Sequence, residues 1–278
     1  MMTMHDRALW RKTAGVAAFI GILAFTSACG TTDTLDDPLP RTEVSASTEA
    51  TATPEATATP TATSSSSGLP AGLGVPAATG TLVSAPNGDY LQSVIAPDDP
   101  VMTLNPAILD PSVDTLGQAE VQEAQKVIIS FMAEQGIDSP VNGGGMTADE
   151  WWAKNKDQLH PAYQEAMHSD MKEGKVFILN EKWQQEKYGD KYRYITSPDK
   201  PRIYDLAITP KVVWVLEGKT VAVQAEVSYN IPVTPGVGLM GTGIQTTSGT
   251  MSYSVTKDPA TGKWLIDGYD HTVDTIEG

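Results

Sequence analysis

The stretch Thr220-Val-Ala-Val-Gln-Ala-Glu-Val-Ser-Tyr-Asn-Ile-Pro-Val233 carries the clearest structural pattern in this chain of 278 residues. From Val221 to Tyr229 every second residue is apolar, and polar residues occupy most of the positions between them. Because successive side chains of a strand point to opposite faces, this pattern predicts a strand with one apolar and one wet face. Such strands are typical of an antiparallel sheet.

Neighbouring segments extend this sheet on both sides. Residues 211–216 precede the strand across Glu217-Gly218-Lys219, which predicts a hairpin. A second hairpin is predicted for residues 247–256 and 263–269, because the turn-forming run Asp258-Pro-Ala-Thr-Gly262 separates them. Residues 175–179 and 203–209 also have strand composition.

Helical periodicity comes earlier in the chain. A first helix is predicted over residues 116–135, ending at Gly136, with apolar residues at helical spacing: Val121, Ala124, Ile128, Phe131 and Met132. A second helix opens at Thr147, which forms a capping-box pattern with Glu150. Pro161 is expected to bend this helix or to restart it.

Helices followed by hairpin strands predict an α+β domain, with N-terminal helices packed on a curved antiparallel sheet. The element order over residues 114–278 resembles the NTF2-like (cystatin-like) superfamily, including small domains of actinobacterial lipoproteins, and Gly262-Lys-Trp-Leu-Ile-Asp-Gly-Tyr269 looks like its last strand. The resemblance implies a pocket between sheet and helices, which three aromatic strand residues would line: Trp214, Tyr229 and Tyr253. If the pocket is filled, the same residues are core.

The N-terminus has the organisation of a secretory signal peptide, predicted over residues 1–28. Basic residues Arg7, Arg11 and Lys12 precede an uncharged apolar run at 14–25, and the small residue Ala28 ends the segment. The apolar run is well short of the roughly 20 residues that a membrane-spanning helix needs. These features predict export and cleavage.

Cys29 is the only cysteine in the chain, so it cannot form an internal disulfide. The residues before it resemble the lipobox of bacterial lipoproteins, with Thr26 where that family usually has leucine. The resemblance implies lipidation of the Cys29 thiol, cleavage after Ala28, and anchoring to the extracytoplasmic face of the cell membrane by acyl chains such as palmitate. The alternative is a free cysteine at the end of an ordinary signal peptide.

The segment after the cysteine is predicted to be a disordered tether over residues 29–80. It is rich in Thr, Ala, Pro and Ser and almost lacks large apolar residues, so it cannot offset its own ordering entropy. Residues 81–113, rich in Pro, Gly and Asp, are predicted to form an irregular arm before the folded domain at 114–278.

The net charge and the sequence motifs narrow the range of possible functions. A formal net charge of −15 argues against nucleic acid and against adhesion to anionic headgroups. Gly236-Val-Gly-Leu-Met-Gly241 spells a dinucleotide fingerprint, but prolines precede it and strand sequence follows, so we interpret it as a hairpin tip. No cofactor is expected.

No metal or nucleophile site is predicted either. His160 and His168 are too far apart on a helix to share a metal ion. Near the C-terminus four residues could supply ligands, but their spacing matches no known loop, and we interpret them as solvated: Asp267, Asp270, His271 and Asp274. The chain has no nucleophile elbow.

Two functions follow as expectations. The first is a non-enzymatic, lipid-anchored protein whose NTF2-like domain binds an envelope protein or a small ligand. The alternative is an envelope enzyme that uses an acid–base residue in the sheet–helix pocket, with Asp205 or Tyr229 as examples.

Overall fold

The computed structural model describes residues 69–85, 88–142, 146–173, 194–234 and 243–277. The predicted signal peptide, Cys29, most of the tether, the strand at 175–179 and the glycine motif at 236–241 lie outside the described residues. Among the helices that are described, none is long and apolar enough to cross a membrane.

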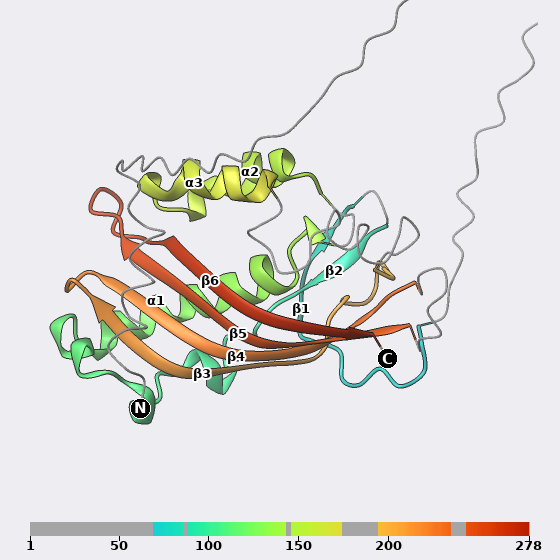
Figure 1. Cartoon of the computed structure of the whole chain (residues 1–278), viewed down its shortest axis with the longest axis horizontal. Helices are drawn as coiled ribbons and strands as arrows, with labels where there is room; N and C mark the ends of the chain where they lie inside the picture. Colours follow the sequence, from blue (N-terminus) through green and yellow to red (C-terminus); the bar gives the residue numbers. More distant parts are fainter. Residues whose placement is uncertain (1–68, 86–87, 143–145, 174–193, 235–242, 278) are drawn as a thin grey trace, which may run out of the picture. The chain divides into compact units, whose positions relative to one another are not determined.

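Four antiparallel strands form the main sheet in the order β3-β4-β5-β6. Figure 1 shows them as long, bent neighbours: β3 (Tyr204–Leu216), β4 (Thr220–Pro232), β5 (Ile244–Lys257) and β6 (Trp264–Glu277). Both predicted hairpins are confirmed. The segments predicted at 203–209 and 211–216 are one strand, β3, whose register shifts between Pro210 and Val212.

The alternation predicted for β4 is also confirmed. Val221 and Val223 are completely buried, whereas Glu226 and Ser228 are exposed. The buried valines stand opposite Val215 and Val213 of β3, so one face of the sheet is apolar across both strands. This face contributes to the hydrophobic core.

Helix α1 (Gln118–Phe131) packs against β4, β5 and β6 and buries its apolar side in the same core. It begins two residues later than predicted, because a 3-10 turn, η5 (Pro111–Thr115), occupies the chain just before it. A π-helix, η6 (Met132–Ile137), continues α1 past the predicted stop at Gly136. The described part is therefore an α+β fold, as predicted.

The second helical region is two helices, α2 (Ala148–Asn155) and α3 (Pro161–Lys172). The predicted capping box is present, since the Thr147 and Glu150 side chains each bind the backbone amide of the other residue. Pro161 restarts the helix, because proline is compatible with the first turn, where its missing N–H has no partner to lose.

The arm at 81–113 is more regular than predicted. Strands β1 (Thr79–Val83) and β2 (Tyr90–Ser93) pair antiparallel. Two further 3-10 turns, η3 (Pro100–Met102) and η4 (Pro106–Ile108), precede η5. All three turns follow the same rule: an Asp or Asn side chain accepts a hydrogen bond from the turn amide, and proline follows it directly.

The folded part also starts earlier than the predicted boundary at residue 80. The Ala77 amide donates to the Ile203 carbonyl oxygen at 3.0 Å, and Pro76 forms a bridge with Tyr204. Residues that the composition assigns to the tether therefore join the edge of β3. Backbone pairing, which composition does not report, explains the difference.

Candidate functional site

The space between the sheet and α1 is filled by side chains. Tyr229 is 1% exposed and Tyr253 is 2% exposed, and both belong to the hydrophobic core. Tyr253 packs edge-on against Phe131 of α1, with ring centroids 5.7 Å apart. Of the two alternatives for these tyrosines, the structure supports core residues rather than the lining of an open pocket.

The placement of Trp214 in the same pocket is wrong. Trp214 lies between Val213 and Val215, which are both buried in the core, so its side chain points to the opposite face of the sheet. Its cross-strand neighbour is Ala222. The register is unbroken from Val212 to the hairpin turn, so the alternation of β3 itself places Trp214 on this face.

Neither example of an acid–base residue suits that role. Asp205 is exposed and accepts hydrogen bonds from the Val75 amide and the Asn230 side chain, both at 2.9 Å. Burial raises the pKa of Tyr229 well above its usual value, so its hydroxyl stays protonated. Asp205 therefore lies at the surface, and Tyr229 lies inside the filled core.

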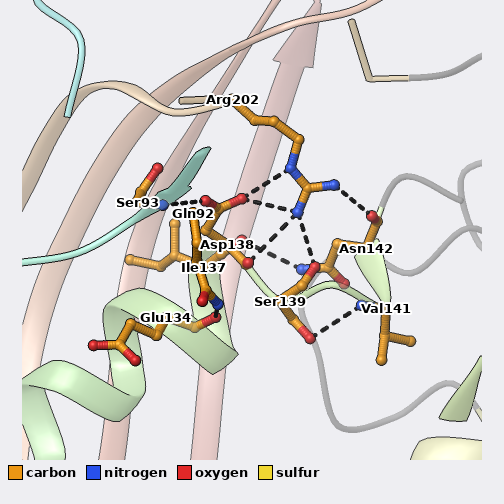
Figure 2. A network of polar contacts seen from close by, with 9 residues as sticks. All are labelled: Gln92, Ser93, Glu134, Ile137, Asp138, Ser139, Val141, Asn142 and Arg202. Carbon is orange, nitrogen blue, oxygen red and sulfur yellow. Dashed lines mark hydrogen bonds and ion pairs between the residues drawn. The ribbon is translucent and has the colours of Figure 1, made fainter. Parts of the chain in front are cut away.

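The most elaborate polar arrangement is a buried ion pair that sequence reasoning missed. The side chains of Arg202 and Asp138 are both 0% exposed. Two guanidinium nitrogens of Arg202, Nη2 and Nε, lie 2.8 and 3.0 Å from Asp138 Oδ1 (Figure 2). The other carboxylate oxygen accepts the Ser93 amide of β2 at 2.6 Å.

Arg202 also donates to the backbone. Nη1 donates to the Asn142 carbonyl oxygen and Nη2 to that of Ser139, each at 2.9 Å. The guanidinium carbon lies 3.8 Å from the centroid of the Tyr90 ring, a cation–π contact. The arrangement therefore ties β2, the chain after η6 and the chain before β3 together.

The chemistry of this pair is structural. Complete burial raises the pKa of the Asp138 carboxyl, while the Arg202 guanidinium and the Ser93 amide oppose this shift by stabilising the carboxylate. Both charges already have protein partners and neither reaches solvent, so the pair offers nothing to a substrate. The sequence signal for this pair was weak. Asp138 follows an isoleucine, Arg202 precedes one, and 64 residues separate the two charges.

Glu134 in the π-helix η6 is a second residue that the sequence did not single out. Its side chain is half-buried, and burial raises the pKa of its carboxyl. Its backbone carbonyl accepts the Gln92 side chain at 2.9 Å, but within the described ranges its carboxylate pairs with no cation. Isolated π-turns often mark functional positions in helices.

A shallow hollow of about 370 Å³ lies on the sheet face that carries Glu226 and Ser228. Its other polar walls are the hydroxyls of Thr209, Ser248 and Thr250. Glu226 is exposed and pairs with Lys211 at 2.7 Å. The hollow can hydrogen-bond a polar molecule, but it holds no buried charge that would select one.

A tyrosine group joins α3 to β6. The Tyr269 hydroxyl donates to Asp170 Oδ2 at 3.0 Å, and its ring lies 6.3 Å from that of Tyr163. Burial raises the pKa of both tyrosines, so their hydroxyls stay protonated. His271 stacks on Tyr269, and burial lowers the pKa of its imidazole.

The candidate metal ligands do not converge. Asp267 accepts hydrogen bonds from the hydroxyls of Ser254 and Thr256, and His271 and Asp270 point to opposite faces of β6. His168 pairs with Asp149 at 2.9 Å on the helical side. Across the residues that the structure describes, no group of three His, Asp or Glu side chains could hold a metal ion.

Comparisons with known proteins found no relative of this chain. No family model, no curated protein and no solved structure matches it.

Proposed function

We propose that this protein is a lipoprotein, anchored through Cys29 on the extracytoplasmic face of the cell membrane, whose NTF2-like domain binds an envelope protein. The observation that carries the proposal is a single cysteine placed directly after an uncharged apolar run at 14–25 and the small residues Ser27 and Ala28. The two acyl chains of a diacylglycerol group on that thiol suffice for stable attachment. The net charge of −15 gives the chain no attraction to anionic headgroups, so the lipid is the anchor.

The folded part supports a binding module. Helices that precede a four-stranded antiparallel meander are consistent with an NTF2-like domain. Its interior is occupied by Tyr229 and Tyr253, which favours a partner on the surface over a small ligand inside. Fold likeness alone establishes no activity, so the proposal rests on the anchor and the filled core.

Cys29→Ser is expected to abolish lipid attachment, because serine lacks the thiol that receives the lipid. Cells expressing the full chain would be grown with an alkyne-tagged palmitate, fractionated and washed with salt. The native chain should be labelled and pellet with membranes, while Cys29→Ser should be unlabelled and leave the pellet. Thr26→Leu, which matches the usual lipobox, should keep the label. Membrane retention of Cys29→Ser after the wash would refute the anchor.

A second candidate function, acid–base chemistry by an envelope enzyme, is favoured by Glu134. A half-buried carboxyl with a raised pKa can hold or release a proton nearer neutral pH than an ordinary glutamate. Glu134 lies in the π-helix η6, where the side-chain spacing differs from the regular α-helical spacing of α1. Glu134 replaces Asp205 and Tyr229 as the group to test.

Carbon-detected NMR titration of the isotope-labelled chain tests Glu134. One glutamate carboxyl should titrate above the ordinary glutamate value of about 4.3. That signal should be missing from Glu134→Gln, while Glu123→Gln, which removes an exposed glutamate of α1, should leave it in place. If every glutamate titrates at or below its ordinary value, the enzymatic alternative loses its support.

A further inference from the structure

Over most of one edge of the main sheet, no partner strand lies among the residues that the structure describes. Strand β6 pairs with β5 on one side, from Trp264 to Glu277. On its other side, the only backbone hydrogen bond within the described residues comes from the His160 amide to the Ile266 carbonyl oxygen at 2.8 Å. From Gly268 onward, the N–H and C=O groups that point away from β5 therefore face no other described strand.

The opposite edge of the sheet, formed by β3, has backbone partners. The Asp205 amide of β3 donates to the Val75 carbonyl oxygen at 2.7 Å, and the Val213 carbonyl oxygen accepts the Asp110 amide at 2.8 Å. Segments N-terminal to the helices thus cover β3 at both ends. Figure 1 shows β6 as the last strand of the sheet, with the helices near its first half only. A sheet edge of this length with no described partner strand is a template for another strand.

Side chains along this part of β6 alternate in chemistry. Tyr269, His271 and Val273 are half-buried on the core side. Asp270 and Asp274 are exposed on the other side. An incoming strand would therefore place apolar residues beside the first set and would gain most from basic residues beside the aspartates.

The aspartates also argue against a second copy of this chain as the occupant. Two β6 strands paired antiparallel about Thr272 would bring Asp270 of one copy opposite Asp274 of the other, twice. Like charges that face each other across a ladder are destabilising. The edge therefore discriminates between its own copy and a basic strand.

We propose that the edge of β6 from Gly268 to Glu277 binds an extended segment of a partner protein as a fifth strand, with apolar and lysine or arginine residues alternating along it. The inference names the contact surface of the proposed interaction function and rests on it. Main-chain hydrogen bonds would hold the segment, and the aspartates would select its charge.

The test measures binding of a fluorescein-labelled peptide, Thr-Lys-Val-Lys-Val-Lys-Val-Thr, to the full-length protein in detergent by fluorescence anisotropy. Three comparisons separate backbone pairing from charge. A peptide with an N-methyl group on every residue from the second to the seventh lacks main-chain donors along both edges, and a peptide with Glu for Lys reverses the charge. The double variant Asp270→Asn/Asp274→Asn removes both edge charges, and the control Asp98→Asn/Asp114→Asn removes two exposed charges that lie outside β6.

We expect the lysine peptide to bind, the N-methylated and glutamate peptides to fail, and the edge variant to bind about 3- to 10-fold more weakly than the control variant. The difference should shrink at high salt, because exposed charges are screened. Equal binding of the methylated peptide, or equal loss in both double variants, would overturn the proposal. A dimer of the native chain in sedimentation that the peptide does not dissociate would assign the edge to a second copy instead.

The two proposals fail independently. Peptide binding is measured in detergent and does not depend on Cys29, whereas the palmitate label does not depend on β6. A lipidated protein that ignores the peptide would refute the edge and leave the anchor intact.

Discussion

Arg202→Met is expected to lower the free energy of unfolding by about 3–5 kcal/mol, the range for removing one partner of a buried ion pair. Methionine has a similar length but no charge, so the Asp138 carboxylate would remain completely buried without its cation. The carbonyl oxygens of Ser139 and Asn142 would also lose their donors. Urea unfolding followed by circular dichroism measures the loss.

A matched surface pair supplies the control. Lys257 lies 2.6 Å from Glu120, with both side chains more than 40% exposed. Lys257→Met should therefore change the unfolding free energy by about 1 kcal/mol or less. If both methionine variants lose the same stability, the Arg202 pair contributes no more than a surface pair.

The double variant Arg202→Met/Asp138→Asn tests whether the charge itself is responsible. Asparagine keeps an acceptor for the Ser93 amide but carries no charge, so the double variant should be more stable than Arg202→Met alone.

Acidification should also restore part of the stability that Arg202→Met loses. Burial raises the pKa of the Asp138 carboxyl in the folded state, and without Arg202 one opposing influence is gone. A raised folded pKa means that the folded state binds more protons, so the deficit should shrink as pH falls toward 4.

Gly249→Ala is expected to destabilise the fold by about 3 kcal/mol, the upper part of the usual range for overpacking. A Cβ at this position in β5 would overlap the Thr272 carbonyl oxygen and lie 2.6 Å from the Val273 Cα atom. Both atoms belong to the backbone of β6, which cannot rotate away as a side chain would. The two strands would have to separate where they are now paired.

Thermal unfolding of Gly249→Ala and its neighbour Ser248→Ala gives the comparison. Ser248 is exposed on the same strand, so its substitution should stay within about 0.5 kcal/mol of the native chain. A Gly249→Ala protein as stable as Ser248→Ala would show that β6 is not held closely against β5 at this point.

Sequence patterns predicted the elements whose cause is local. The alternation in β4, the turn at Glu217-Gly218-Lys219 and the Thr147–Glu150 box all depend on residues a few positions apart, and all three are present. The 3-10 turns at 100–115 were missed as structure, although their repeated pattern of Asp or Asn followed by proline is equally local. That signal was in the sequence and could have been used.

The contacts between distant segments could not be predicted in this way. Nothing near Asp138 or Arg202 in the chain indicates that the two charges meet, because 64 residues separate them. Whether the sheet–helix space is open depends on how Tyr229 and Tyr253 pack against α1.

The proposed address of the protein therefore comes from its chain chemistry, since one thiol behind an apolar run can be recognised without any fold. The same holds for the α+β class, because side-chain periodicity follows directly from backbone geometry. Long-range packing determines which charges are buried, which aromatic residues fill the core and which edge of the sheet has no described partner strand. The buried charges, for example, meet only because β2, the end of η6 and the start of β3 come together around Arg202.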